Sequence, residues 1–397
     1  MKKLKLLILK ATFLLSGINL PAQGLQEELL FSYDIESKIA LGELRTTSAS
    51  YYYTFIGDYS SAISLYDIPV SWGVDTLILS DLSQAPALAK ILEIARDQQI
   101  VIISESHLKP QHRIFAKKLI DSLYDYGFRH LGIETLAVDS TQKNNLHDSL
   151  LRERKFPMSL VTGFYAREPQ MADLIRTALH KGYQLFGYDR EKKLPGKDRD
   201  EIQADNIIKY LNSSGNDKII LYGGWHHANE SNDKKPGRNA FWMAKYLKDK
   251  TGIDPLTIYQ DNFTEKMVTN THPYLASRTF TEHSIFMDKD GTIASLSPQV
   301  DIEIIHPKTT YINGRPSWLR QHDFSREFYF EDIPADIDYP LLLMAFIPGE
   351  EKMGVPVDIF EMKDRYDRKP LLLVPGNYVI RIFNKAKTID KAISLEP

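Results

Sequence analysis

The middle of the chain alternates between short apolar runs and longer stretches of helical periodicity. The apolar runs lie at residues 100–103, 131–133, 184–187, 218–221 and 256–259. Several of the helical stretches between them stop at a glycine, which tolerates the left-handed backbone of a helix C-terminus. This order predicts five strands of a largely parallel sheet with helices on both faces, which is an α/β fold.

The two ends of the chain follow other patterns. Residues 25–67 show helical spacing around a Gly57-Asp58-Tyr59 break, which predicts a helical hairpin. Residues 284–296 predict a β-hairpin, and 300–305 a further strand. From residue 334 onward, apolar runs at 341–346, 355–360, 371–374 and 378–383 alternate with turn signals. These runs predict a small antiparallel, sandwich-like β domain.

These patterns divide the chain into four parts: a signal peptide (1–22), an N-terminal helical segment (23–75), an α/β catalytic-type domain (76–333) and a C-terminal β domain (334–397). The signal peptide is predicted from three lysines, a mostly apolar stretch at 6–20, and Leu20-Pro21-Ala22 before Gln23. We therefore expect an exported, soluble protein, periplasmic or secreted, with no membrane span after signal cleavage.

The composition of the chain mainly excludes certain partners and kinds of site. The formal net charge is −3 and no basic stripe is present, so nucleic acid is not an expected partner. The chain has no cysteine, which excludes a lipoprotein anchor, disulfides and thiolate metal sites. It also lacks the Gly-x-Ser-x-Gly and His-Glu-x-x-His motifs. The sequence gives no signal for the oligomeric state.

Candidate chemistry gathers after the predicted strands, where ligands bind in open parallel sheets. Each strand is followed by an ionisable group, and the set comprises Glu105, His107, Glu134, Asp189, Arg190, Glu191, His226, His227, Glu230 and Asp261. Glu134 directly follows an apolar strand, so it is either paired with a cation or functional. Arg113, on the next helix after His107, is a candidate for that cation.

Histidines near carboxylates allow two kinds of chemistry. They can bind one divalent metal ion, zinc or manganese, through His107, Glu134, Asp189 and His227. They can equally activate water directly as general base and acid, and the sequence leaves both open. Ser104 and Ser106 are further candidate nucleophiles beside His107. His112 is expected at the surface.

At these residues the chain resembles the erythromycin esterase / ChaN-like / TIKI superfamily, and its erythromycin-esterase-like branch most. Members are similar to one another in two strand-end motifs of Gly-x-x-His type, the first commonly carrying a glutamate. Ser104-Glu105-Ser106-His107 resembles the first, with serine in place of glycine, and Gly224-Trp225-His226-His227 resembles the second. The second match favours His227 over His226. The resemblance covers roughly residues 100–261.

Two further positions are similar to the family. Glu134 resembles its next acidic position, and Arg199 begins a segment similar to an arginine-led helix. The resemblance implies a hydrolase that cleaves an ester or amide bond of a small-molecule or peptide substrate. The implied catalytic set is Glu105, His107, Arg113, Glu134, Arg199 and His227.

In that set, the histidines would be base, acid or metal ligands, and the glutamates would orient them or bind metal. The arginines would hold charge or stabilise an oxyanion. Two alternatives stay open. One is a heme- or metal-binding protein of ChaN-like type without turnover, and the other is a scaffold with a vestigial site. Because no strand-end group lies beyond Asp261, the C-terminal β domain is expected to be dispensable for activity.

Overall fold

The structure is a computed structural model that describes residues 29–65, 81–142, 145–189, 194–215, 217–265, 278–321 and 325–396. The predicted signal peptide and two of the residues after the third predicted strand, Arg190 and Glu191, lie outside these ranges. None of the described helices is long and apolar enough to cross a membrane.

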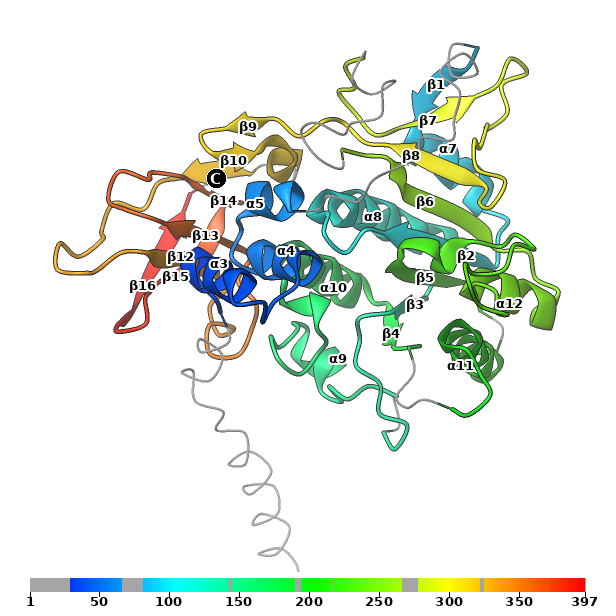
Figure 1. Cartoon of the computed structure of the whole chain (residues 1–397), viewed down its shortest axis with the longest axis horizontal. Helices are drawn as coiled ribbons and strands as arrows, with labels where there is room; N and C mark the ends of the chain where they lie inside the picture. The colour runs from blue at the N-terminus through cyan, green and yellow to red at the C-terminus, as the bar shows by residue number, and fades with distance from the viewer. Residues whose placement is uncertain are drawn as a thin grey trace, which may run out of the picture.

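An eight-stranded sheet forms the centre of the molecule, with strand order β1-β7-β8-β6-β2-β5-β3-β4 (Figure 1). In that order, the strands are β1 (Ser83–Pro86), β7 (Ser284–Met287), β8 (Ile302–Ile305), β6 (Leu256–Phe263), β2 (Ile100–Glu105), β5 (Ile219–Gly224), β3 (His130–Ile133) and β4 (Gln184–Phe186). The strands from β8 to β4 run parallel to one another, and β7 is antiparallel to both of its neighbours, β8 and β1. The α/β fold and the five parallel strands expected from the sequence are confirmed.

Helices cover both faces of this sheet. The helices α7 (Ala87–Ala95), α8 (Pro110–Leu123) and α10 (Pro169–Lys181) pack on one face, and α11 (Arg199–Ser213) and α12 (Met243–Thr251) pack on the other. Along β2, Val101 and Ile103 face the first layer and Ile100 and Ile102 face the second. Residues 100–103 of this strand are all apolar because both of its faces are buried.

The remaining described elements are short, apart from those at the two ends of the chain. They are α9 (Leu151–Arg154), β9 (Tyr311–Ile312), β10 (Arg315–Pro316), and the 3-10 helices η1 (Tyr124–Tyr126), η2 (Tyr165–Arg167), η3 (Trp225–Ala228) and η4 (Ser317–Gln321). Two sheet strands differ from expectation. β1, which was not predicted, lies directly before α7. β7 pairs with β1, while Met287 and Ile293 form a single bridge of the predicted hairpin.

The N-terminal helices are α3 (Ser32–Ala40), α4 (Thr46–Phe55) and α5 (Tyr59–Ser64). The C-terminal region is a four-stranded antiparallel sheet, β13 (Asp358–Met362), β12 (Leu341–Phe346), β15 (Gly376–Phe383) and β16 (Thr388–Leu395), beside a pair formed by β11 (Arg326–Phe328) and β14 (Leu371–Leu373). Of these, β11 and β16 were not predicted from the sequence.

The N-terminal helices pack on this C-terminal sheet (Figure 1). Alternate residues of β12 explain how both faces of the sheet are buried. Leu342 and Met344 contact the helices, whereas Leu341 and Leu343 face β14. The fit is close at Gly57, where an added Cβ would lie 1.9 Å from the carbonyl oxygen of Ile359. The first and last parts of the described chain therefore share one hydrophobic core.

Candidate functional site

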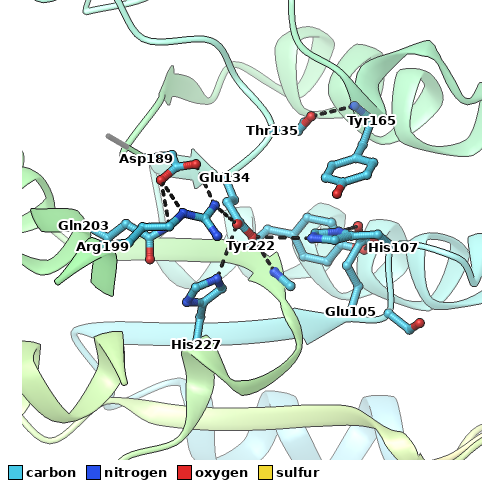
Figure 2. A network of polar contacts seen from close by, with 12 residues as sticks. Glu105, His107, Glu134, Thr135, Tyr165, Asp189, Arg199, Gln203, Tyr222 and His227 are labelled. Atoms are coloured by element: carbon cyan, nitrogen blue, oxygen red, sulfur yellow. Dashed lines mark hydrogen bonds and ion pairs between the residues drawn. The ribbon is translucent and has the colours of Figure 1, made fainter. Parts of the chain in front are cut away.

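Three neighbouring strands bring the predicted side chains together at their C-terminal ends. The strands β2, β5 and β3 are adjacent, and in their register Glu105 lies beside Gly224. Glu105 ends β2, Glu134 follows β3, and His227 lies on η3 after β5. Figure 2 shows these side chains and His107 meeting in one polar network.

Glu105 orients the ring of His107. The Nδ1 atom of His107 donates to Glu105 Oε1 at 2.7 Å. Arg113 Nε and the Tyr222 hydroxyl donate to the other oxygen, at 2.9 and 2.6 Å. Burial raises the pKa of Glu105, but the charge of Arg113 and the hydrogen bond from His107 outweigh it and hold the pKa at about 2. Glu105 is therefore an ionised acceptor at neutral pH.

Glu134 is the shared centre of the site. Its Oε2 accepts from the Gly224 backbone N–H at 2.6 Å and lies 3.8 Å from His107 Nε2. Its Oε1 accepts from Arg199 and lies 3.3 Å from His227 Nε2. Burial raises the pKa of Glu134. The interactions with His227, His107 and Arg199 together outweigh burial, so the pKa lies well below its usual range.

His227 has a carboxylate on each side. Its Nδ1 atom donates to Asp200 Oδ1 at 2.5 Å, and Asp200 also accepts from Lys235 and from the Met243 backbone N–H. Burial lowers the pKa of His227, but Glu134 and Asp200 raise it to about 10. His227 is therefore an imidazolium at neutral pH.

Arg199 lies on the solvent side of this network. It begins α11 and binds Asp189 through Nε at 2.9 Å and through Nη2 at 2.6 Å, while Gln203 Nε2 donates to Asp189 at 3.1 Å. Its side chain is 35% exposed, whereas that of Glu134 is 5% exposed. A substrate approaching the site from this side meets the guanidinium first.

The two glycines that end β5 provide space for the neighbouring side chains. An added Cβ at Gly224 would lie 2.4 Å from His107 Nε2, and one at Gly223 would lie 2.3 Å from the Tyr188 hydroxyl oxygen. The chain then turns sharply at Trp225, which has a φ of 35°, a strained value for a residue with a side chain. This turn directs His227 back toward Glu134.

Some sequence-based expectations differ from the structure. Arg113 is fully buried and binds Glu105 and Glu168, so it is not the cation beside Glu134. Arg199 occupies that position because α11 begins next to the end of β3. The expectation that His112 lies at the surface is wrong. It is buried, and its Nδ1 accepts from the Ser106 backbone N–H at 3.0 Å.

Other expected residues are separate from the network. The hydroxyls of Ser104 and Ser106 are buried without a hydrogen-bond partner in the described part of the chain, so neither forms a serine–histidine pair with His107. His226 is exposed and packs beside Trp242, with ring centroids 5.1 Å apart. His227, but not His226, therefore lies beside Glu134.

The four proposed metal ligands do not fit a resident metal ion. Within the described ranges, no group of three or more histidine, aspartate or glutamate side chains is arranged to hold one. The guanidinium of Arg199 lies between Glu134 and Asp189, so these two carboxylates already share a cation. An axial heme ligand is equally unsupported at His227, because both of its ring nitrogens already have carboxylate partners.

Sequence reasoning missed several contributors. Asp200 directly follows Arg199, and Tyr222 lies inside β5, two residues before Gly224. Tyr165, on η2, stacks on His107 with ring centroids 3.9 Å apart, and Trp225 packs edge-on against the same ring at 4.9 Å. Only Asp200 had a sequence signal, because a carboxylate in the first turn of a helix at a strand end is a candidate partner for a histidine.

The fold and site together define an α/β protein with a carboxylate–histidine network at the C-terminal ends of parallel strands. No protein-family model matches the sequence, and no curated protein matches it significantly.

Solved structures that resemble parts of the chain include the type III effector HopBA1, with 16% identity and a TM-score of 0.28 over 46% of this chain and 87% of that chain. Another is RRSP, a MARTX toxin effector domain from Vibrio vulnificus CMCP6, with 16% identity and a TM-score of 0.27 over 40% of this chain and 33% of that chain. A third, described as bacterial protein toxins, has 15% identity and a TM-score of 0.30 over 54% of this chain and 44% of that chain. Similarity at this level carries no argument about activity.

Proposed function

We propose that this protein is a hydrolase that cleaves an ester or amide bond, of the type that its resemblance to the erythromycin esterase / ChaN-like / TIKI superfamily implies. The observation that carries the proposal is a pair of carboxylate-oriented imidazoles on either side of one glutamate. Glu105 orients His107, Asp200 orients His227, and both Nε2 atoms face Glu134.

His107 is suited to be the general base. Glu105 is ionised and can only accept hydrogen bonds, so Nδ1 of His107 carries the ring proton. Nε2 then has a lone pair with which to take a proton from water. In the proposed reaction, that water attacks the carbonyl carbon of the substrate as it loses its proton to Nε2. Tyr165 and Trp225 fix the plane of the ring.

Arg199 and His227, the two cations on the other side of Glu134, can stabilise the negative charge that develops during the reaction. Attack by water places a negative charge on the carbonyl oxygen, and fixed cations and donors stabilise such an oxyanion. Arg199 supplies a permanent charge at the solvent side. His227 holds a proton on each ring nitrogen, so it can donate one to the leaving group. Glu134 keeps both cations in place.

A screen of purified protein tests this proposal. Nitrophenyl esters and aminoacyl amides are the substrates, each measured with and without a chelator, beside a metal analysis of the protein. We expect turnover that survives the chelator and is lost in Glu105→Gln, which keeps the shape of the side chain but not its charge. A protein that hydrolyses none of these substrates but carries a stoichiometric metal or heme would instead support the binding-protein alternative.

We also propose that the protein is exported. The support is sequence alone, namely the lysines at positions 2, 3 and 5, the apolar stretch that follows, and the Ala22-Gln23 exit. Sequencing the N-terminus of the mature protein from a native source tests this. A chain that begins near Gln23 is the expected result, and one that retains Met1 would contradict it.

A further inference from the structure

An aromatic surface adjoins His107 on the side away from Glu105. We call it the aromatic shelf, and it consists of Tyr51, Tyr52, Phe55, Phe164 and Tyr165. Phe164 lies at its centre, with ring centroids 5.2 to 6.4 Å from those of the other four residues. Tyr165 connects the shelf to the site, because its ring stacks on His107 (Figure 2).

The shelf is fixed to the same strand end that carries Glu134. The Tyr165 backbone N–H donates to Thr135 Oγ1 at 2.9 Å, as Figure 2 shows. An added Cβ at Gly163 would lie 1.8 Å from the Thr135 carbonyl oxygen, so the two loops are in direct contact. The other half of the shelf comes from α4, whose Tyr51 ring lies 5.2 Å from that of Tyr165. The N-terminal helices therefore contribute to the site.

The outer part of the shelf faces solvent. Phe164 is 44% exposed although four aromatic rings surround it, and Tyr51 and Tyr165 are half-buried. The opposite side of the site is formed by the charged groups Arg199 and Asp189. The network thus has aromatic rings on its His107 side and charged groups on its Arg199 side.

The shelf also carries a polar pair. The hydroxyls of Tyr51 and Tyr165 are hydrogen-bonded to each other, and both sense the charges of Glu105 and Glu134. Two hydroxyls have two protons and use one of them in their shared hydrogen bond. The second proton can therefore be donated to a polar atom of a bound molecule.

We propose that the aromatic shelf binds an apolar, preferentially aromatic group that lies next to the scissile bond of the substrate, while the tyrosine pair donates a hydrogen bond to the substrate. This inference rests on the proposed hydrolase function and names its substrate class, namely esters or amides of aryl-bearing acids. An aromatic contact contributes about 0.5–1.5 kcal/mol beyond area burial, which corresponds to roughly two- to twelvefold in binding.

The kinetic test uses two esters with the same leaving group, nitrophenyl phenylacetate and nitrophenyl acetate. In the full-length protein, we expect the ratio of their kcat/KM values to favour phenylacetate, and Phe164→Ala to lower that ratio by about fivefold. Phe164→Leu is a second variant that retains apolar packing if the alanine protein folds poorly. Tyr51→Phe keeps the ring, so it should slow both esters and leave the ratio unchanged.

Tyr366→Ala is the matched control, because Tyr366 is an 84% exposed aromatic residue in the C-terminal region. It should change neither ester. If Phe164→Ala and Phe164→Leu slow both esters equally, or leave both unchanged, the shelf does not select the substrate.

A binding measurement separates this inference from the proposed activity. Titration calorimetry with phenylacetate and acetate needs no turnover. Binding that prefers phenylacetate and weakens in Phe164→Ala supports the shelf even if neither ester is hydrolysed, in which case only the hydrolase proposal fails. Turnover of both esters without any preference in rate or binding would overturn the shelf and leave the hydrolase intact.

Discussion

Each imidazole of the site has a carboxylate at Nδ1, yet the two rings have different surroundings. The carboxylate of Glu105 is shared between His107, the buried Arg113 and Tyr222. His227 instead lies between Asp200 and Glu134, and these two carboxylates keep it protonated at neutral pH. The pairing thus favours a base on one side of Glu134 and an acid on the other.

Removing the two histidines should have strongly non-additive effects. His107→Ala and His227→Ala should each lower kcat/KM by about 10²-fold or more, because each group moves a proton in the same reaction. The double variant should lose little beyond either single change. Steady-state kinetics of the four proteins provide the measurement.

His226→Ala is the control, since His226 is exposed and lies outside the network. Its activity should stay near that of the wild type. If the losses from His107→Ala and His227→Ala multiply in the double variant, the residues act in separate steps. If His226→Ala lowers activity and His227→Ala does not, the functional histidine of the second motif is His226 and not His227.

At the scale of elements, the strand order decides which groups meet. In the sequence, His107 and His227 belong to separate strand–helix units, and they become neighbours because β5 lies between β2 and β3. This arrangement also places the backbone of Gly224 against both His107 and Glu134. A glycine is required there because the space for a side chain is already occupied.

Gly224→Ala should therefore damage the site more than the fold. The added methyl group would overlap the His107 ring, which must rotate away from Glu134. We expect kcat/KM to fall at least tenfold through this misplacement. Gly252→Ala is a matched control, because Gly252 ends α12 with a φ of 72° and has open space around it. It should lower stability by about 1 kcal/mol and leave kcat/KM unchanged. Equal activity in the two variants would contradict the packing argument.

The elements themselves could be predicted, because apolar runs and helix-ending glycines are local signals. The five parallel strands follow them closely, and Glu105, His107, Glu134 and His227 were found as strand-end groups. The order of the strands could not be predicted, since it depends on contacts between distant segments. For the same reason, the partners of Arg113, the burial of His112 and the approach of Tyr51 had no local signal.

Three buried histidines from different elements of the α/β part have their rings in contact. His112 lies on α8, His283 precedes β7, and His306 follows β8. The ring of His306 lies 4.5 Å from that of His112 and 4.9 Å from that of His283. Burial lowers the pKa of all three, and together with the charge of Lys118 it lowers that of His283 to about 3. The cluster is therefore neutral in the folded protein.

Acid should destabilise the protein through this cluster. An unfolded histidine has a pKa near 6.5, so the unfolded chain takes up protons below that pH while the folded cluster does not. The stability contributed by neutral His283 is complete above pH 6.5 and is lost as pH falls toward 3. Between pH 6.5 and 5 the loss is about 2 kcal/mol per imidazole.

Urea unfolding at pH 7 and pH 5 measures this loss. His283→Phe should reduce the difference in unfolding free energy between the two pH values by about 2 kcal/mol. His226→Phe changes an exposed histidine and should leave the difference unaltered. A difference that stays the same in His283→Phe would show that the ring is already protonated in the folded protein.

At the scale of the whole molecule, the C-terminal region is tied to the rest of the chain. Its four-stranded sheet supports α3 to α5, and α4 carries Tyr51. Two buried arginines from earlier in the chain also have their carboxylate partners there. Arg176 on α10 binds Glu350, and Arg315 on β10 binds Asp358. This packing argues against the expectation that the region is dispensable.

The buried pair of Arg176 and Glu350 provides the sharpest test of that dependence. Arg176 Nε donates to Glu350 Oε2 at 3.0 Å, and both side chains are less than 10% exposed. Removing one charge from a buried pair leaves the other uncompensated, at a cost of about 3–5 kcal/mol. Glu350→Gln should therefore lower the unfolding free energy by about that amount in urea titrations.

Asp332 and Lys391 form a control pair that also connects the two regions, with Asp332 76% and Lys391 34% exposed in their side chains. Because solvent screens an exposed ion pair, Asp332→Asn should cost less than about 1 kcal/mol. A chain ending at Ile333 loses both partner carboxylates and the support of α4, so we expect it to be unfolded at neutral pH. A soluble chain of that length with a cooperative unfolding transition and wild-type kcat/KM would show that the α/β part folds and works alone.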